Sequence, residues 1–175
     1  MHAASRIATA FRAVPLALAL ACAGGCASYQ LGSMLPADIR TVHVPTFQNA
    51  TQEPLLEIDV TNATIQEFQT DGTLGIAGAG AADAILEATI TGFELRPLRY
   101  ERDEPSRASE YRLRLSASVV LKKRASQKLV VQAPSVIGET WFVPGADLVA
   151  AKRTALPDAA RQLAHNIVEQ IVEAW

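Results

Sequence analysis

The clearest alternation of apolar and polar positions runs through residues 109–123. Odd-numbered positions from Tyr111 to Leu121 are apolar, and the even-numbered positions between them are mostly polar, beginning with Arg112 and Arg114. A period of two is typical of a β-strand with one buried face and one face in water. The pattern therefore predicts a strand that carries both arginines on its outward face.

Two further long strands follow from the same reasoning. Residues 83–100 alternate in the same way, and Pro97 is expected to bend or end their regular pairing. Residues 129–142 form the next strand, which Pro134 interrupts. Short polar segments, residues 101–108 and 123–127, separate the three strands, so we expect them to pair as antiparallel hairpins.

An earlier strand is predicted at residues 39–47, where β-forming side chains dominate. Pro45 lacks a backbone N–H, which indicates an edge position or a bulge. Residues 48–51 read as the turn that follows. Residues 75–82, which are rich in glycine and alanine, are expected to form a loop.

A first helix is predicted at residues 54–70. Thr51 or Glu53 can cap it, Pro54 suits its first turn, and Gly72 stands where a left-handed residue commonly follows a helix. Its expected apolar face consists of Leu55, Ile58, Thr61, Ile65 and Phe68.

A second helix is expected to begin after Asp147, which is a suitable N-cap. Pro157 should kink this helix or divide it in two. Its apolar stripe indicates a side packed against the core. The stripe consists of Leu156, Ala160, Leu163, Ala164, Ile167 and Ile171.

The order of elements predicts an α+β fold. One strand, one helix, three strands and one helix (β-α-β-β-β-α) give a two-layer sandwich with a four-stranded, mostly antiparallel sheet and two helices on one face. No internal boundary is evident, so residues 39–175 are expected to form one domain.

The first 25 residues have the pattern of a bacterial export signal. Arg6 and Arg12 precede an apolar run at residues 14–23 that is too short to span a bilayer. The small residues before Cys26 resemble a lipoprotein box, which predicts a signal peptide at residues 1–25, acylation of Cys26 and a tether at residues 26–38. Cys22 is the alternative acylation site. A serine two places after Cys26, rather than an aspartate, favours the outer membrane, with the domain on the periplasmic side.

Candidate catalytic chemistry is sparse. The only cysteines lie in the leader region, and His43 and His165 have no second metal ligand at helical spacing. No known nucleophile or hydrolase motif is present. We therefore expect no enzyme activity, no metal and no cofactor. A net charge of −2 and an isoelectric point near 5.9 give no indication of nucleic-acid binding.

Charge is unevenly distributed along the chain. Residues 96–128 hold ten of the sixteen Lys and Arg residues and four acidic residues, a net charge of +6, whereas the rest of residues 27–175 carries −10. Arg112 and Arg114 are one pleat apart, and arginine can bind phosphate through two parallel hydrogen bonds. An anion site and an ordinary solvated face are both compatible with this pattern.

Several motifs resemble one known family. The segments CASYQLG (residues 26–32), IRTVHVPTFQN (residues 39–49), QTDG (residues 69–72), ADAILEATI (residues 82–90) and SEYR (residues 109–112) are similar, in this order, to those of the lipopolysaccharide-assembly lipoproteins, the LptE family. The resemblance spans nearly the whole chain from Cys26 onward.

The resemblance implies a function and two partners. Members of the family plug the lumen of a large outer-membrane β-barrel, LptD, assist its assembly, and bind lipopolysaccharide on its way to the cell surface. The corresponding ligand-binding residues here would be Arg102, Arg107, Arg112, Arg114 and Lys123, with Lys152 and Arg153 as a second basic pair. The alternative is a free-standing envelope lipoprotein that acts as a scaffold or binds an anionic ligand.

Overall fold

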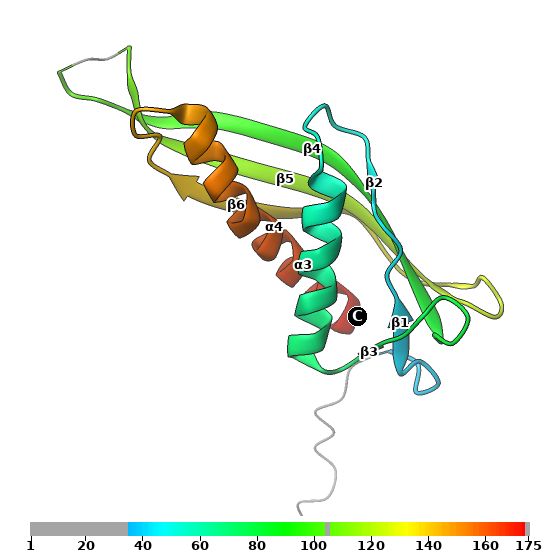
Figure 1. Ribbon diagram of the computed structural model, residues 1–175. Helices are drawn as coiled ribbons and strands as arrows, with labels where there is room; N and C mark the ends of the chain where they lie inside the picture. Colours follow the sequence, from blue (N-terminus) through cyan, green and yellow to red (C-terminus); the bar gives the residue numbers. More distant parts are fainter. Residues whose placement is uncertain (1–34, 104–105, 174–175) are drawn as a thin grey trace, which may run out of the picture. The chain divides into compact units, whose positions relative to one another are not determined.

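The computed structural model describes residues 35–103 and 106–173, and all of them lie in the second of two units into which the chain divides, Ser33–Trp175. Six strands and two helices make up the described chain (Figure 1). In chain order they are β1 (Thr41–His43), β2 (Gln48–Asn49), α3 (Leu56–Asp71), β3 (Gly75–Ile76), β4 (Ala84–Tyr100), β5 (Ala108–Lys123), β6 (Leu129–Phe142) and α4 (Leu148–Val172).

The strands form one mixed sheet. Its order is β3-β1-β4-β5-β6, and β2 pairs with the same edge of β4 as β1 does, a few residues farther along. Antiparallel pairing joins β4 to β5 and β5 to β6, whereas the short strands β1, β2 and β3 pair in parallel. Pairing between β4 and β5 extends from Ala84 opposite Lys123 to Tyr100 opposite Ala108.

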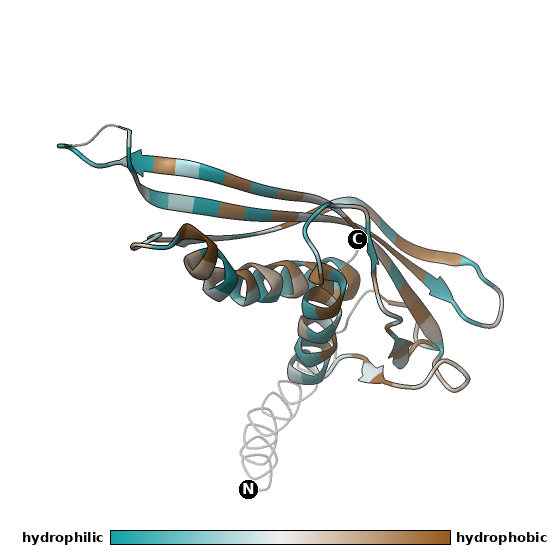
Figure 2. Cartoon of the chain, turned by 45° about the horizontal axis from the view of Figure 1, so that its top comes forward, coloured by the Kyte–Doolittle hydropathy of each residue, from teal (hydrophilic) through white to brown (hydrophobic). Residues whose placement is uncertain are grey.

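Both helices lie on the same side of the sheet (Figure 1), where α4 packs against β5 and β6 and α3 packs against α4. Hydrophobic and hydrophilic residues alternate along the long strands (Figure 2), and in β5 buried positions alternate with partly exposed ones. Leu113, Leu115 and Leu121 of β5 meet Leu163 and Ile167 of α4 in a common core. Each such side chain contributes about 1.5–3 kcal/mol when it is fully buried. The α+β class and the placement of both helices on one face are thus confirmed.

The predicted four-stranded, mostly antiparallel sheet is wrong in detail. Residues 39–47 do not form one strand, because Pro45 cannot donate to a ladder and the pairing resumes only at Gln48. Residues 48–51, expected to be a turn, contain β2, and the predicted loop at residues 75–82 contains β3. Strands of two or three residues are too short to show an alternating pattern. Their pairing partners also lie far away in the chain, so the sequence gives no local indication of them.

Helix α3 differs from its expected apolar face. Leu55 and Ile58 are 61% and 48% exposed, whereas Thr61 and Phe68 are buried as expected, and Leu56, Val60 and Thr64 are buried in addition. The buried threonines are tolerated because Thr61 Oγ1 donates to Glu57 O at 2.5 Å and Thr64 Oγ1 donates to Val60 O at 2.8 Å. Neither expected N-cap is used, since the helix follows Leu55 in a left-handed conformation without a side-chain cap.

The expected helix ends at Gly72 and Asp147 are confirmed. Gly72 follows α3 with a φ of 76°. Asp147 Oδ1 accepts hydrogen bonds from Val149 N at 2.8 Å and Ala150 N at 3.2 Å at the start of α4. Pro157 lies within α4 without dividing it. Because Pro157 is exposed, the carbonyl left without its helical partner can be hydrated.

Gly138 brings α4 unusually close to the sheet. A Cβ added at this residue would lie 2.5 Å from both Cα and Cβ of Leu163, and closer still to its backbone nitrogen. The neighbouring Asn166 donates from Nδ2 to Ile137 O at 2.6 Å. Backbone contact and this hydrogen bond therefore fix α4 along the open edge of β6.

Asp83 fastens β1 to the beginning of β4. Its Oδ2 accepts from Thr41 Oγ1 at 2.8 Å, Thr41 N at 3.0 Å and Arg40 N at 3.1 Å. The hydrogen bond from the Thr41 side chain, followed by that from Arg40 N, lowers the pKa of Asp83 below its ordinary value. Because β1 has only three residues and few hydrogen bonds to its neighbours, the Asp83 carboxylate helps to hold it in place.

We expect Asp83 to add an acid-sensitive contribution to stability. Because its pKa is lower in the folded state, this contribution is complete above the unfolded pKa of about 3.9 and is lost as the pH falls through the folded value. Urea unfolding between pH 2 and pH 7 measures it, and Asp83→Asn should flatten the acidic limb. Asp103→Asn, which removes none of these hydrogen bonds, is the matched control. An unchanged acidic limb in Asp83→Asn would contradict the assignment.

Candidate functional site: an arginine cluster on the outer face of the sheet

Within the described residues, no helix covers the sheet side opposite α3 and α4, which we call the outer face. Register places its side chains in rows across β4, β5 and β6. Glu94 lies opposite Arg114, which in turn lies opposite Glu139. One pleat farther, Arg96 lies opposite Arg112, which lies opposite Trp141. The outer face therefore gathers three arginines from two strands.

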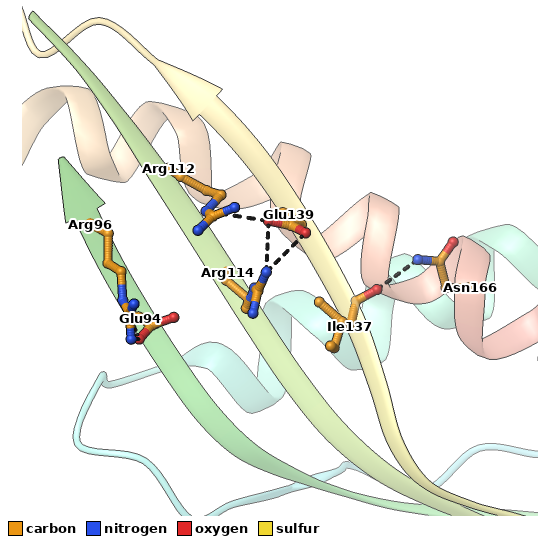
Figure 3. A network of polar contacts seen from close by, with 7 residues as sticks. All are labelled: Glu94, Arg96, Arg112, Arg114, Ile137, Glu139 and Asn166. Carbon is orange, nitrogen blue, oxygen red and sulfur yellow. Dashed lines mark hydrogen bonds and ion pairs between the residues drawn. The ribbon is translucent and has the colours of Figure 1, made fainter. Parts of the chain in front are cut away.

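We call Arg96, Arg112 and Arg114 the arginine cluster. Arg96 pairs with Glu94, and both arginines of β5 pair with Glu139 (Figure 3). Glu139 lies between the two arginines of β5: Arg114 Nη2 is 3.3 and 3.4 Å from its two carboxylate oxygens, and Arg112 Nε is 3.5 Å from Oε2. Arg96 Nε donates to Glu94 Oε1 at 2.6 Å. Three positive and two negative charges leave the cluster with an excess of one positive charge.

The two arginines of β5 are partly buried and incompletely paired. Their side chains are 30% exposed for Arg112 and 33% for Arg114. Arg114 Nε is buried and has no hydrogen-bond partner among the described residues. The distance from Arg112 to Glu139 is that of an ion pair rather than a good hydrogen bond. Because Arg114 Nε is shielded, the Nη groups of the two arginines are the donors that can meet an oxyanion, which arginine binds with planar, bidentate geometry.

Apolar side chains adjoin the cluster along β6. Trp141 is 61% exposed, and Ile137 is also exposed two pleats away on the same side of the strand. A large aromatic ring that is exposed beside arginines can pack against the apolar face of a ligand. The outer face therefore combines positive charge with an aromatic surface.

The sequence-predicted binding residues do not all meet here. Arg112 and Arg114 lie together, as expected. Arg102 is exposed in the loop after β4, and Arg107 forms an ion pair of 3.3 Å with Glu101 near the same loop. Lys123 Nζ donates to Asp38 at 2.6 Å at the opposite end of β5, eleven residues or about 36 Å from Arg112.

One member of the cluster, Arg96, and the neighbouring carboxylate of Glu139 were missed by sequence reasoning. Arg96 and Glu139 become neighbours of Arg112 and Arg114 only through the register of three strands. A signal existed for Arg96, which lies in the predicted partner strand. The second basic pair is not part of the cluster, since Lys152 Nζ binds Glu53 at 2.7 and 2.9 Å and lies 5.5 Å from the centre of the Phe93 ring.

The two histidines among the described residues, His43 and His165, each contact an oxygen of a neighbouring residue. His43 Nδ1 is 3.3 Å from Ala77 O, and His165 Nδ1 is 2.9 Å from Glu67 Oε1, an interaction that raises the pKa of His165. Within residues 35–103 and 106–173, no group of three or more His, Cys, Asp or Glu side chains is placed to hold a metal ion. No helix in those residues is long and apolar enough to cross a membrane. Cys22 and Cys26 lie outside the described residues.

We expect Glu139→Gln to strengthen anion binding by the cluster. The carboxylate neutralises Arg112 and Arg114 in the free protein, and an incoming phosphate must compete with it. Removing that competitor should raise the affinity for inorganic phosphate, measured by titration, roughly threefold or more at low salt, with a smaller gain at high salt. Glu110→Gln, which breaks the 3.2 Å ion pair of Arg99, is the matched control. Equal effects of the two variants would show that only net charge matters.

A sheet with one face packed by helices and the other bearing partly exposed arginines defines a small α+β domain. The family model described as lipopolysaccharide assembly, LptE, matches residues 39–172. The chain therefore belongs to the LptE family, which confirms the resemblance found in its motifs.

Solved structures support the fold. A crystallised protein from Xanthomonas campestris has a TM-score of 0.57 at 13% identity, over 79% of this chain and 87% of that one. A minor lipoprotein from Acinetobacter baumannii has a TM-score of 0.52 at 10% identity, over 77% of this chain and 93% of that one. At such identities the similarity concerns the fold alone. No curated protein sequence matches the chain significantly.

Proposed function

We propose that this protein is an outer-membrane lipoprotein that plugs an LptD-type β-barrel, assists its assembly, and binds lipopolysaccharide during delivery to the cell surface. The observation that carries the proposal is the LptE family match over residues 39–172. Acylation of Cys26, after removal of the signal peptide at residues 1–25, would attach the domain to the periplasmic side of the membrane. The proposed role is one of assembly and binding and requires no catalytic group.

The arginine cluster supplies the chemistry for the ligand. Lipopolysaccharide carries phosphates on a saccharide, and guanidinium groups bind phosphate oxygens through charge-assisted hydrogen bonds. Arg112 and Arg114 contribute from the uncovered outer face, and Arg96 adds a third positive charge. Arg102 and Arg107 near the tip of the β4–β5 hairpin would extend the positive surface.

The position of the tether suits a plug that enters from the periplasm. Residues 26–38 lead into β1, and Asp38 is held by Lys123 at one end of the sheet. The tether spans at most roughly 40 Å when extended. The arginine cluster lies about 36 Å along β5 from that end. An anchor at Cys26 would therefore keep one end of the domain near the inner leaflet and place the arginines deeper in the barrel.

Affinity purification from outer membranes tests the proposal. A tagged protein is expected to bring down a single large β-barrel, and its depletion should reduce lipopolysaccharide at the cell surface. Cys26→Ala shows how far the anchor contributes to both results. Recovery of the protein without a barrel, together with normal surface lipopolysaccharide after depletion, would favour a free-standing envelope scaffold instead.

A further inference from the structure

Apart from the arginine cluster, the outer face has a polar recess, which lies nearer to β1 than the cluster does. It has a volume of about 430 Å³ and is bounded by the link between β1 and β2 on one side and by β5 on the other. Residues 87–89 of β4 also line it. The residues used below are Pro45, Thr46, Gln48, Thr89, Ser118 and Val120.

Hydrogen-bonding groups in this recess are unused by the protein. The hydroxyls of Thr46, Thr89 and Ser118 and the amide of Gln48 have no side-chain partner within the part of the chain that the structure describes. Thr89 and Ser118 are cross-strand neighbours, and Gln48 lies opposite Thr89 on the other side. One row of the sheet therefore presents an amide and two hydroxyls in sequence.

The same recess is unsuited to an anion. The residues that line it include one carboxylate, Glu87, which holds Lys122 Nζ at 2.6 Å, and no lysine or arginine. Pro45 and Val120 add apolar surface beside the hydroxyls. Hydroxyls and an amide that both donate and accept, next to apolar patches, match a neutral sugar, whose ring has polar edges and apolar faces.

The recess and the arginine cluster lie on one continuous surface. Ser118 and Arg114 are four residues apart on the same side of β5, a distance of about 13 Å. Between them lie Ser116 and Gly92, which are too small to obstruct the surface between the two sites. A phosphorylated oligosaccharide of a few sugars can reach from one site to the other.

We infer that this recess binds neutral sugar units of the lipopolysaccharide saccharide while its phosphates lie on the arginine cluster. The inference rests on the proposed function for the identity of the saccharide. It assigns two kinds of recognition to one face: charge at Arg112 and Arg114, and hydrogen bonding at Thr89 and Ser118.

Titration of the full-length protein with three probes tests the inference. The probes are intact lipopolysaccharide, its delipidated and dephosphorylated oligosaccharide, and a soluble cell-wall glycan. The Thr89→Val/Ser118→Ala variant removes two hydroxyls with little change in shape, and we expect it to weaken oligosaccharide binding about tenfold. The Arg112→Gln/Arg114→Gln variant should weaken binding of intact lipopolysaccharide far more than binding of the dephosphorylated oligosaccharide. Thr154→Val, on the exposed side of α4, is the matched control, and thermal unfolding checks that each variant is folded.

The outcomes separate this inference from the proposed function. If intact lipopolysaccharide binds but the oligosaccharide does not, or if Thr89→Val/Ser118→Ala binds it normally, the sugar subsite is wrong and the proposed function stands. If the oligosaccharide binds through Thr89 and Ser118 while the protein has no barrel partner, the subsite stands and the proposed function fails. Preference for the cell-wall glycan would overturn the inference.

Discussion

Replacement of Gly138 by alanine is expected to lower the free energy of unfolding by roughly 3 kcal/mol or more. The new methyl group would overlap the backbone of Leu163, so α4 must move away from β6 or the sheet must bend. Such a loss corresponds to a decrease of roughly 6–12 °C in the melting temperature of a domain of this size. Thermal and urea unfolding measure the effect, and valine in place of Gly138 should be worse.

Gly78→Ala is the matched control for this prediction. An added Cβ at Gly78 meets no atom within 4 Å, and the residue does not have a positive φ. Its replacement should be neutral or slightly stabilising, because alanine restricts the unfolded chain. Similar melting temperatures for Gly138→Ala and Gly78→Ala would mean that α4 does not contact β6 as closely as described.

Loss of both arginines of β5 is expected to weaken lipopolysaccharide binding by roughly 10- to 100-fold, since hydrogen bonds to charged groups contribute about 1.5–3 kcal/mol each. The Arg112→Gln/Arg114→Gln variant also leaves Glu139 without its partners, which could disturb the sheet. A triple variant that adds Glu139→Gln restores a neutral, hydrogen-bonding row. Binding is measured by titration at two salt concentrations, and both variants should show a weaker salt dependence than the wild type.

Lys123→Gln is the control that separates the arginine cluster from general positive charge. It removes one positive charge at the opposite end of β5, where Lys123 is held by Asp38. We expect lipopolysaccharide affinity to change little. If Lys123→Gln weakened binding as much as the double arginine variant, the ligand would not be confined to the cluster.

The long strands were predictable because their signal is local. Alternation along residues 109–123 and 129–142 follows from the two environments of a strand, and the observed β5 and β6 agree with these ranges to within one residue. The short strands β1, β2 and β3 form by pairing with β4 or with each other, and these partners lie far apart in the sequence. No local pattern of residues encodes such pairing. The face of α3 was predicted only in part: Thr61 and Phe68 are buried as expected, whereas Thr64, which bonds to its own helix and so needs no polar surroundings, was missed.

The candidate site was only half accessible from the sequence. The shared side of Arg112 and Arg114 follows from their spacing of two residues. Their connection to Glu139 depends on register, which the chain alone leaves open. Lys123 is an odd number of residues away from both arginines, so its side chain lies on the other side of the strand. This could have been inferred from the sequence.

The fold and the charges assign different tasks to the two sides of the sheet. The helix-covered side holds the domain together through the core formed by β5, β6 and α4. The outer face is left for partners, with the arginine cluster toward one end and the polar recess nearer to β1. We therefore regard the outer face as the surface on which the protein meets lipopolysaccharide.

Photocrosslinking in living cells tests this central claim most directly. A photoreactive amino acid in place of Trp141, which is exposed beside Arg112, should form adducts with lipopolysaccharide, whereas one in place of Gln69, exposed on α3, should not. Under the proposed function both positions would contact the barrel, so barrel adducts serve as evidence that the protein is correctly placed. Lipopolysaccharide adducts from Gln69 and none from Trp141, in cells with normal barrel adducts, would contradict the account.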